Sequence, residues 1–180
     1  MTLLLDARGV AKQFAGVRAL DGVDFDLRAG EVHALIGENG AGKSTLAKLL
    51  SGDIAAYDGT LAVDGTVRHF ASPRDAIACG IAMIPQELQL IGSLSVAANI
   101  SLGKEARTAA GLIDTPALRA VARLQLDATG AGHIPADALV GMLDAADRQL
   151  VAIARALSLH ARCLIMDEPT ASLGDAEAAR

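Results

Sequence analysis

The chain has 180 residues, of which 52% are hydrophobic and 21% charged, so it can build a substantial core and does not have the composition of a disordered chain. Its net charge is −5 and no run of Lys or Arg forms a basic patch, which argues against duplex nucleic acid as a partner. We see no secretion signal and no apolar stretch long enough to span a bilayer, so we expect a cytoplasmic protein.

The amino-terminal segment is predicted to form strands. Residues 3–28 are interpreted as strands with a turn at Asp21-Gly22, a dipeptide that favours hairpins. Phe14 lies in this predicted sheet. The next segment, residues 32–36, is a short apolar run, and its composition predicts a buried parallel strand.

Residues 37–45 match the phosphate-binding P-loop pattern, which is Gly, four residues and then Gly-Lys-Ser. Glycines let the backbone fold around a triphosphate with N–H groups pointing inward. Lys43 adds a positive charge for the β- and γ-phosphates, and the Ser44 hydroxyl can ligate Mg²⁺. An apolar helical pattern follows and ends at Gly52. The assigned nucleotide-binding residues are Gly37, Glu38, Asn39, Gly40, Ala41, Gly42, Lys43, Ser44 and Thr45.

The middle of the chain changes from strands to helices. A second hairpin is expected at residues 61–70 with its turn at Asp64-Gly65, and Ser72-Pro73 predicts the start of a short helix. Residues 81–84 form a short apolar strand pattern before Gln86. Helical patterns are expected over 95–126 and 144–159, with a loop rich in Gly and Ala between them.

The last predicted strand, residues 163–166, ends in Asp167-Glu168. An apolar strand that ends in two acids is the Walker B arrangement, in which Asp167 can hold Mg²⁺ through water and Glu168 can polarise the attacking water. Two solvated acids at a strand end are the alternative interpretation, and the P-loop earlier in the chain argues against it. The two cysteines, Cys79 and Cys163, are expected to be buried, reduced thiols.

Four blocks together resemble an ATPase of the ABC transporter family, and most closely the ATPase subunits of bacterial monosaccharide importers of the ribose or xylose type. They cover nearly the whole chain in the family's order and comprise residues 39–46, 85–88, 148–157 and 166–173. The resemblance implies an α/β P-loop fold with a mixed sheet core, an antiparallel β subdomain and a helical subdomain at about 95–141 that docks on a permease. We therefore expect one ABC ATPase domain over 1–180.

The resemblance also implies roles for single residues. Phe14 is similar to the aromatic residue that stacks on adenine, although a core Phe in a sheet is an open alternative. Gln86 resembles the Q-loop glutamine, which contacts Mg²⁺ and the attacking water. The implied cofactors are ATP and Mg²⁺. The implied partners are a transmembrane permease, a second ATPase unit as a head-to-tail dimer or fused half, and indirectly a periplasmic sugar-binding protein, with the chain peripheral on the inner face of the cell membrane.

Two features depart from the family pattern. Residues 143–147 stand where the family has its signature motif, Leu-Ser-Gly-Gly-Gln or a close variant. Asp144 there brings a negative charge toward the partner unit's γ-phosphate, and Ala146 adds a Cβ where the backbone should approach that phosphate closely. The four histidines all precede Asp167, so none matches the family's switch histidine. We therefore expect an amino-terminal fragment or truncated product that lacks the final sheet strands.

Three functions remain open at this point. The first is ATP hydrolysis that drives sugar import through a permease. The second, favoured by the altered signature at Asp144, is a module that binds nucleotide without hydrolysing it. The third is a soluble ABC ATPase that acts on DNA or the ribosome, and the sequence shows neither the basic nor the coiled-coil inserts expected of that class.

Overall fold

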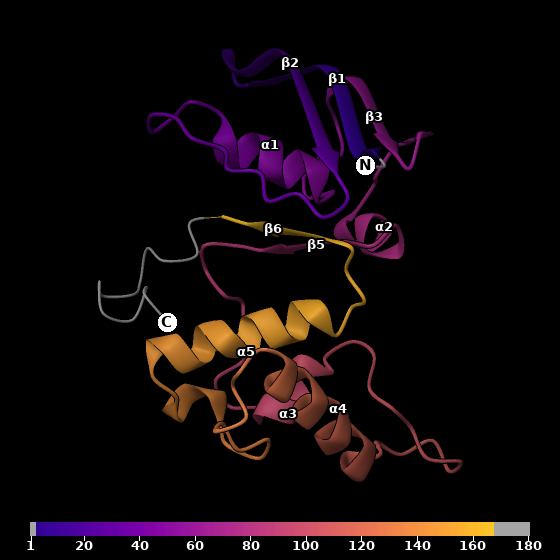
Figure 1. The fold of residues 1–180 in the computed structure, drawn as a ribbon, viewed down its shortest axis with the longest axis vertical. Coiled ribbons are helices and arrows are strands. Elements are labelled where there is room, and N and C mark those ends of the chain that lie inside the picture. The colour runs from indigo at the N-terminus through magenta and orange to yellow at the C-terminus, as the bar shows by residue number, and fades with distance from the viewer. Residues whose placement is uncertain (1–2, 168–180) are drawn as a thin grey trace. The chain divides into compact units, whose positions relative to one another are not determined.

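The computed structural model describes residues 3–167 and divides into two compact units, residues 1–83 and residues 84–180. The first unit is built mainly of strands and the second mainly of helices (Figure 1). This content agrees with the predicted antiparallel β subdomain and helical subdomain, and the unit boundary falls inside a strand at residues 83 and 84.

The first unit is organised around a four-stranded antiparallel sheet in the order β2-β1-β3-β4. The strands are β1 (Leu3–Phe14), β2 (Val17–Arg28), β3 (Asp58–Val63) and β4 (Thr66–Arg68). Leu5 and Ala7 of β1 and Leu61 and Val63 of β3 are buried at alternate positions, because successive side chains of a strand point to opposite faces. The sheet therefore has one face in the core of this unit.

The turn between β1 and β2 lies at Ala15-Gly16, so the prediction of a turn at Asp21-Gly22 is wrong. Ala15 and Gly16 both have positive φ, 42° and 90°, as a two-residue hairpin turn of the favoured type requires. Asp21 and Gly22 instead lie inside β2, where the register shifts between Val10 and Lys12 of β1. The dipeptide thus produces a β-bulge, which accommodates a glycine at positive φ within a strand.

Two helices complete the first unit, α1 (Lys43–Leu50) and α2 (Pro73–Ala78). Ser72 caps α2 in a capping box with Asp75, as the Ser-Pro pattern predicts. The predicted buried strand at residues 32–36 is wrong, since the structure has no strand there and Val32 and Ile36 are 98% and 92% exposed. A parallel strand needs hydrogen-bonded neighbours to be buried, and neither described sheet includes this run.

The second unit contains three α-helices, α3 (Val96–Ile100), α4 (Thr115–Ala128) and α5 (Ala145–Leu157), and a 3₁₀ turn, η1 (Val140–Met142). Each α-helix contacts the other two. Asp114 caps α4 through the backbone N–H of Ala117, and Pro116 lies in the first turn of the helix, where proline is tolerated. The core between them is rich in small side chains, and its centre includes Val96, Ile100, Leu126 and Val151.

The strand β6 (Cys163–Met166) pairs with β5 (Ile81–Ile84) in a two-stranded sheet, as both apolar runs predict. The two strands run in the same direction (Figure 1). The backbone N–H of Asp167 donates to the carbonyl of Ile84 at 3.1 Å, so the pairing extends to the carboxyl end of both strands. This arrangement brings the residues that follow β5 and β6 to one edge of the sheet.

Candidate nucleotide-binding site

The P-loop turns directly into α1, with Gly42 as the N-cap of the helix. Gly40 and Gly42 have φ of 85° and 90°, a conformation that glycine adopts without strain and that turns backbone N–H groups toward one side. The amino-terminal end of α1 adds the positive end of the helix dipole at the same place. Positive φ at these two glycines and a helix start at Lys43 are features that the predicted phosphate-binding loop requires.

Lys43 folds back over this loop in the structure. Its Nζ donates to the carbonyl oxygens of Gly37 at 2.8 Å and Glu38 at 3.0 Å, and the backbone N–H of Ala41 also donates to Glu38, at 3.1 Å. These two hydrogen bonds hold the ammonium group over the loop, where a stronger acceptor could take their place. A phosphate oxygen is such an acceptor, because hydrogen bonds between ionised groups are about twice as strong as neutral ones.

Close packing against β2 fixes the start of α1 in the first unit. A Cβ on Gly42 would overlap the carbonyl oxygen of Ala19 and lie 3.0 Å from a methyl group of Leu20. Only glycine allows β2 to approach the loop this closely. The motif pattern names Gly42 as a phosphate-binding residue, and the structure gives it a second role in joining the loop to the sheet.

Phe14 lies at the end of β1, where its backbone pairs with Val17 of β2. Its side chain is 45% exposed, which argues against the alternative that it is an ordinary core residue. Val17 is two residues from Ala19, the residue that contacts Gly42, and a strand rises about 3.3 Å per residue. Phe14 is thus held on the order of 10 Å from the P-loop along the sheet, and a nucleotide's base can occupy the one site while its phosphates occupy the other.

Two of the predicted catalytic and metal-binding residues follow the strands β5 and β6. Gln86 comes two residues after β5 and Asp167 comes directly after β6, so both stand at the carboxyl edge of that sheet. Glu168 lies outside the described residues. The segment after Gln86 is anchored from two helices, because Arg155 of α5 donates to the carbonyl of Gln89 at 3.1 Å and Asn99 of α3 binds the backbone of Ile91.

The donor atoms of the predicted Mg²⁺ site fit a hard cation. Ser44, Gln86 and Asp167 offer hydroxyl, amide and carboxylate oxygens, which Mg²⁺ prefers. Among residues 3–167 no group of three or more His, Cys, Asp or Glu side chains could hold a metal ion. Mg²⁺ bound with a nucleotide needs no such cluster, because it takes one or two protein ligands together with phosphate oxygens.

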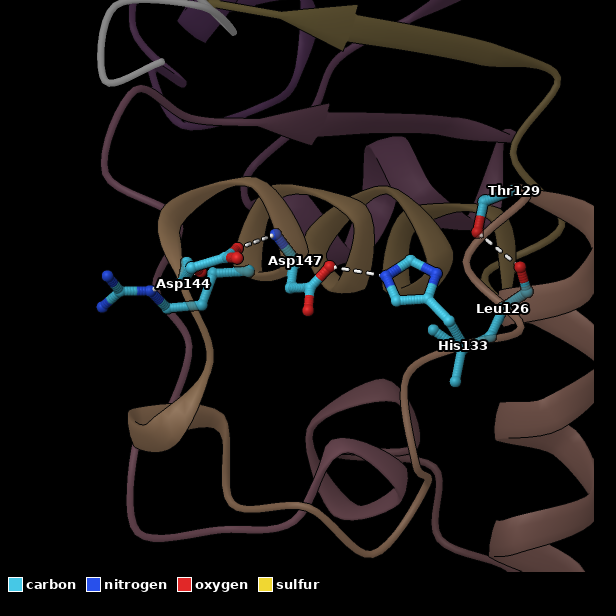
Figure 2. Close-up of polar contacts among 6 residues, drawn as sticks. Leu126, Thr129, His133, Asp144 and Asp147 are labelled. Atoms are coloured by element: carbon cyan, nitrogen blue, oxygen red, sulfur yellow. Dashed lines mark hydrogen bonds and ion pairs between the residues drawn. The ribbon is translucent and has the colours of Figure 1, made fainter. Parts of the chain in front are cut away.

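The signature-like segment 143–147 forms the start of α5. Asp144 is its N-cap, and its Oδ1 accepts the backbone N–H of Asp147 at 2.8 Å. The side chain of Asp147 in turn binds Nε2 of His133 at 2.8 Å (Figure 2). His133 belongs to the loop between α4 and η1, so this hydrogen bond joins that loop to the first turn of α5. Sequence reasoning did not find the pair, because no motif links residues 14 positions apart.

Residues 20–171 match the family model described as ABC transporter. The chain belongs to the ABC transporter family. The ribose import ATP-binding protein of Chromobacterium violaceum is 52% identical over 170 residues, which are 94% of this chain and 34% of that protein. The ribose import ATP-binding protein of Chelativorans is 52% identical over 180 residues, which are 100% of this chain and 35% of that protein.

Solved ABC structures have the same fold. One such structure is an ATP-binding cassette of an ABC transporter in its ADP conformation, which superposes on this chain with a TM-score of 0.82 at 26% identity. The matched region covers 99% of this chain and 74% of that one. A nucleotide-free ATP-binding cassette gives a TM-score of 0.81 at 26% identity, over 98% of this chain and 73% of that one. The predicted ABC-type fold is thus confirmed. The chain spans about a third of the length of the curated relatives that it matches.

Proposed function

We propose that this chain binds ATP with Mg²⁺ and serves as an ATPase half that powers import of a sugar through a membrane permease. The observation that carries nucleotide binding is the P-loop at the start of α1, with Lys43 Nζ held over the loop by the carbonyls of Gly37 and Glu38. Sugar as the transported substrate is supported by the 52% identity to ribose import ATP-binding proteins.

The site residues divide into three roles in this proposal. Residues 37–45 hold the phosphates and Phe14 stacks on adenine, with its half-exposed ring in support. Ser44, Gln86 and Asp167 hold the metal ion, which when bound neutralises charge on the phosphates. Glu168 polarises the attacking water and Gln86 touches that water, so that both orient it for in-line attack.

The partners in this proposal are a permease, a second ATPase unit and, indirectly, a periplasmic sugar-binding protein. The chain would lie on the inner face of the membrane, held there by the permease. Within residues 3–167 the structure has no helix long and apolar enough to cross a bilayer. Attachment through a permease is consistent with that finding.

A second candidate function is nucleotide binding without hydrolysis. The observation that favours it is Asp144 at the N-cap of α5, because its carboxylate occupies the position from which the family's signature serine grips the partner unit's γ-phosphate. A turnover assay of the assembled transporter separates the two candidates, since only the first predicts release of phosphate coupled to transport.

Calorimetry of ATP binding tests the shared part of both candidates. Lys43→Ala should remove most of the affinity, with a loss of about 2–4 kcal/mol for a truncated charge pair. Lys48→Ala is the matched control, because Lys48 is an exposed lysine in the last turn of the same helix. Equal affinity in the wild type and the Lys43 variant would contradict the assignment of the P-loop.

A further inference from the structure

Lys12 and Phe14 lie two residues apart on β1, and alternate residues of a strand share a face. Nζ of Lys12 lies 5.1 Å from the centroid of the Phe14 ring, within the range of a cation–π interaction. The same Nζ donates to the carbonyl oxygen of Ala56, in the segment between α1 and β3. One ammonium group thus joins the aromatic ring to the chain that leaves the P-loop helix.

The contact with Lys12 restricts the orientation of the exposed Phe14 ring. The Phe14 ring is 45% exposed at a strand end, and a base stacks better on a ring whose orientation is already fixed. The ammonium group lies over one face of the ring, so a ligand would stack on the opposite face. Its positive charge also favours an electron-rich partner on that opposite face.

We propose that Lys12 is a positioning residue for the base of the nucleotide. Its ammonium group, bound to the Ala56 carbonyl, fixes the orientation of the Phe14 ring on which the base stacks. Binding then depends on the base as well as on the phosphates. This inference rests on the nucleotide-binding function proposed above. Because Lys43 supplies the charge at the P-loop and the Lys12 ammonium is bound to Ala56, Lys12 contributes to affinity through Phe14 and not through the triphosphate.

The test compares two probes on the 180-residue chain, ATP and inorganic tripolyphosphate, both with Mg²⁺. Lys12→Met keeps most of the aliphatic stem and removes the charge, so it should lower ATP affinity about three- to tenfold and leave tripolyphosphate affinity unchanged. Lys12→Arg should retain the wild-type ATP affinity, because a guanidinium also stacks on aromatic rings. Lys48→Met is the matched control for charge and should change neither affinity.

A second measurement separates positioning from a general effect on folding. In a Phe14→Leu background, Lys12→Met should cause no further loss of ATP affinity, since the ring through which it acts is gone. Equal losses for ATP and tripolyphosphate, an unchanged ATP affinity in Lys12→Met, or additive losses in the double variant would each overturn the proposal. Absence of ATP and tripolyphosphate binding in the wild type would instead overturn the proposed function together with this inference.

Discussion

The Oδ1 atom of Asp144 accepts the backbone N–H of Asp147 at 2.8 Å and closes the first turn of α5. A carboxylate is a strong N-cap and interacts favourably with the helix dipole, so Asp144 stabilises the helix that it begins. The same carboxylate places a negative charge at the residue that stands where the family's signature motif has its serine. The cap therefore favours folding of this unit and disfavours an anion at this position.

We predict that Asp144→Ser together with Ala146→Gly strengthens ATP-driven association with a partner ATPase unit. The serine keeps an N-cap oxygen and removes the negative charge, which opposes closure by roughly 1–3 kcal/mol when it stands near a γ-phosphate. Sedimentation with ATP measures the association. ATP affinity of the isolated chain should not change, because in a head-to-tail pair Asp144 faces the partner's nucleotide.

Asp144→Asn is the matched control for this prediction. It is neutral, nearly the same size and a strong N-cap, so it should provide most of the gain in association without loss of helix stability. If the double variant altered ATP binding by the isolated chain while association stayed flat, residues 143–147 would not form part of a composite site.

Glu168→Gln tests the chemical step. If the carboxylate polarises water, the amide should preserve ATP binding and slow hydrolysis by about 10²-fold or more. The measurement is phosphate release by the assembled transporter, with ATP binding by the same sample as the control. Unchanged turnover would remove Glu168 from this role.

Gly42→Ala and Gly40→Ala form a matched pair that separates steric contact from backbone strain. Both glycines have φ near 90°, so alanine costs about 1–2 kcal/mol at either position. Only at Gly42 would the new Cβ also overlap Ala19, since Gly40 has nothing within 4 Å. Thermal unfolding should therefore show a larger loss for Gly42→Ala, and equal losses would contradict the packing of the P-loop on β2.

Local patterns predict the parts of the fold that local geometry decides. Asp64-Gly65 forms the predicted two-residue turn with φ of 49° and 74°. Asp21-Gly22 is the same dipeptide but forms a bulge, because the turn at Ala15-Gly16 sets the register of β1 and β2. A dipeptide determines which backbone conformations have low energy, and strand pairing determines which of them the chain adopts.

The candidate site likewise has parts that the sequence predicts and parts that it does not. The P-loop is predictable because its glycines, Lys43 and the helix start are contiguous in sequence. The run at residues 32–36 is apolar without being buried, since burial depends on partners that composition does not reveal. Contacts such as His133 with Asp147 and Lys12 with Ala56 join separate elements, and no spacing rule predicts them.

Two buried amides of the second unit should respond differently to removal. Asn99 is fully buried, and its side chain accepts the N–H of Ile91 at 2.8 Å and donates to the carbonyls of Ile91 and Ser95, both at 3.0 Å. Asn99→Leu leaves the N–H of Ile91 without its acceptor, while the carbonyls of Ile91 and Ser95 still accept backbone N–H groups. The expected cost is about 1–3 kcal/mol in denaturant unfolding. Gln149 is 6% exposed, and its Nε2 has no hydrogen-bond partner within the described chain.

Gln149→Met should therefore be neutral or stabilising, because it removes an unpaired buried donor at nearly constant volume. Denaturant midpoints for the two variants measured side by side make the comparison. A destabilisation by Gln149→Met as large as that by Asn99→Leu would show that Nε2 has a partner, such as a bound water.

The two thiols should differ in reactivity. Burial raises the pKa of Cys163 to about 11, so at pH 8 only about one molecule in a thousand carries the reactive thiolate at that site. Cys79 is half-buried at the end of α2 and should supply the single fast-reacting thiol in a native titration with a disulfide reagent. Cys79→Ser should abolish that fast phase, and Cys163→Ser should leave it intact.

The raised pKa of Cys163 also predicts how stability depends on pH. An unfolded thiol ionises near pH 8.5, whereas the folded one stays protonated until about pH 11. The unfolded state therefore binds fewer protons between these values, and the free energy of unfolding falls as pH rises through that window. Cys163→Ala removes this contribution, so its stability should fall less steeply above pH 9 than that of the wild type, measured by denaturant unfolding at each pH. Parallel pH profiles for the two proteins would show that Cys163 ionises as easily in the folded chain as in the unfolded one.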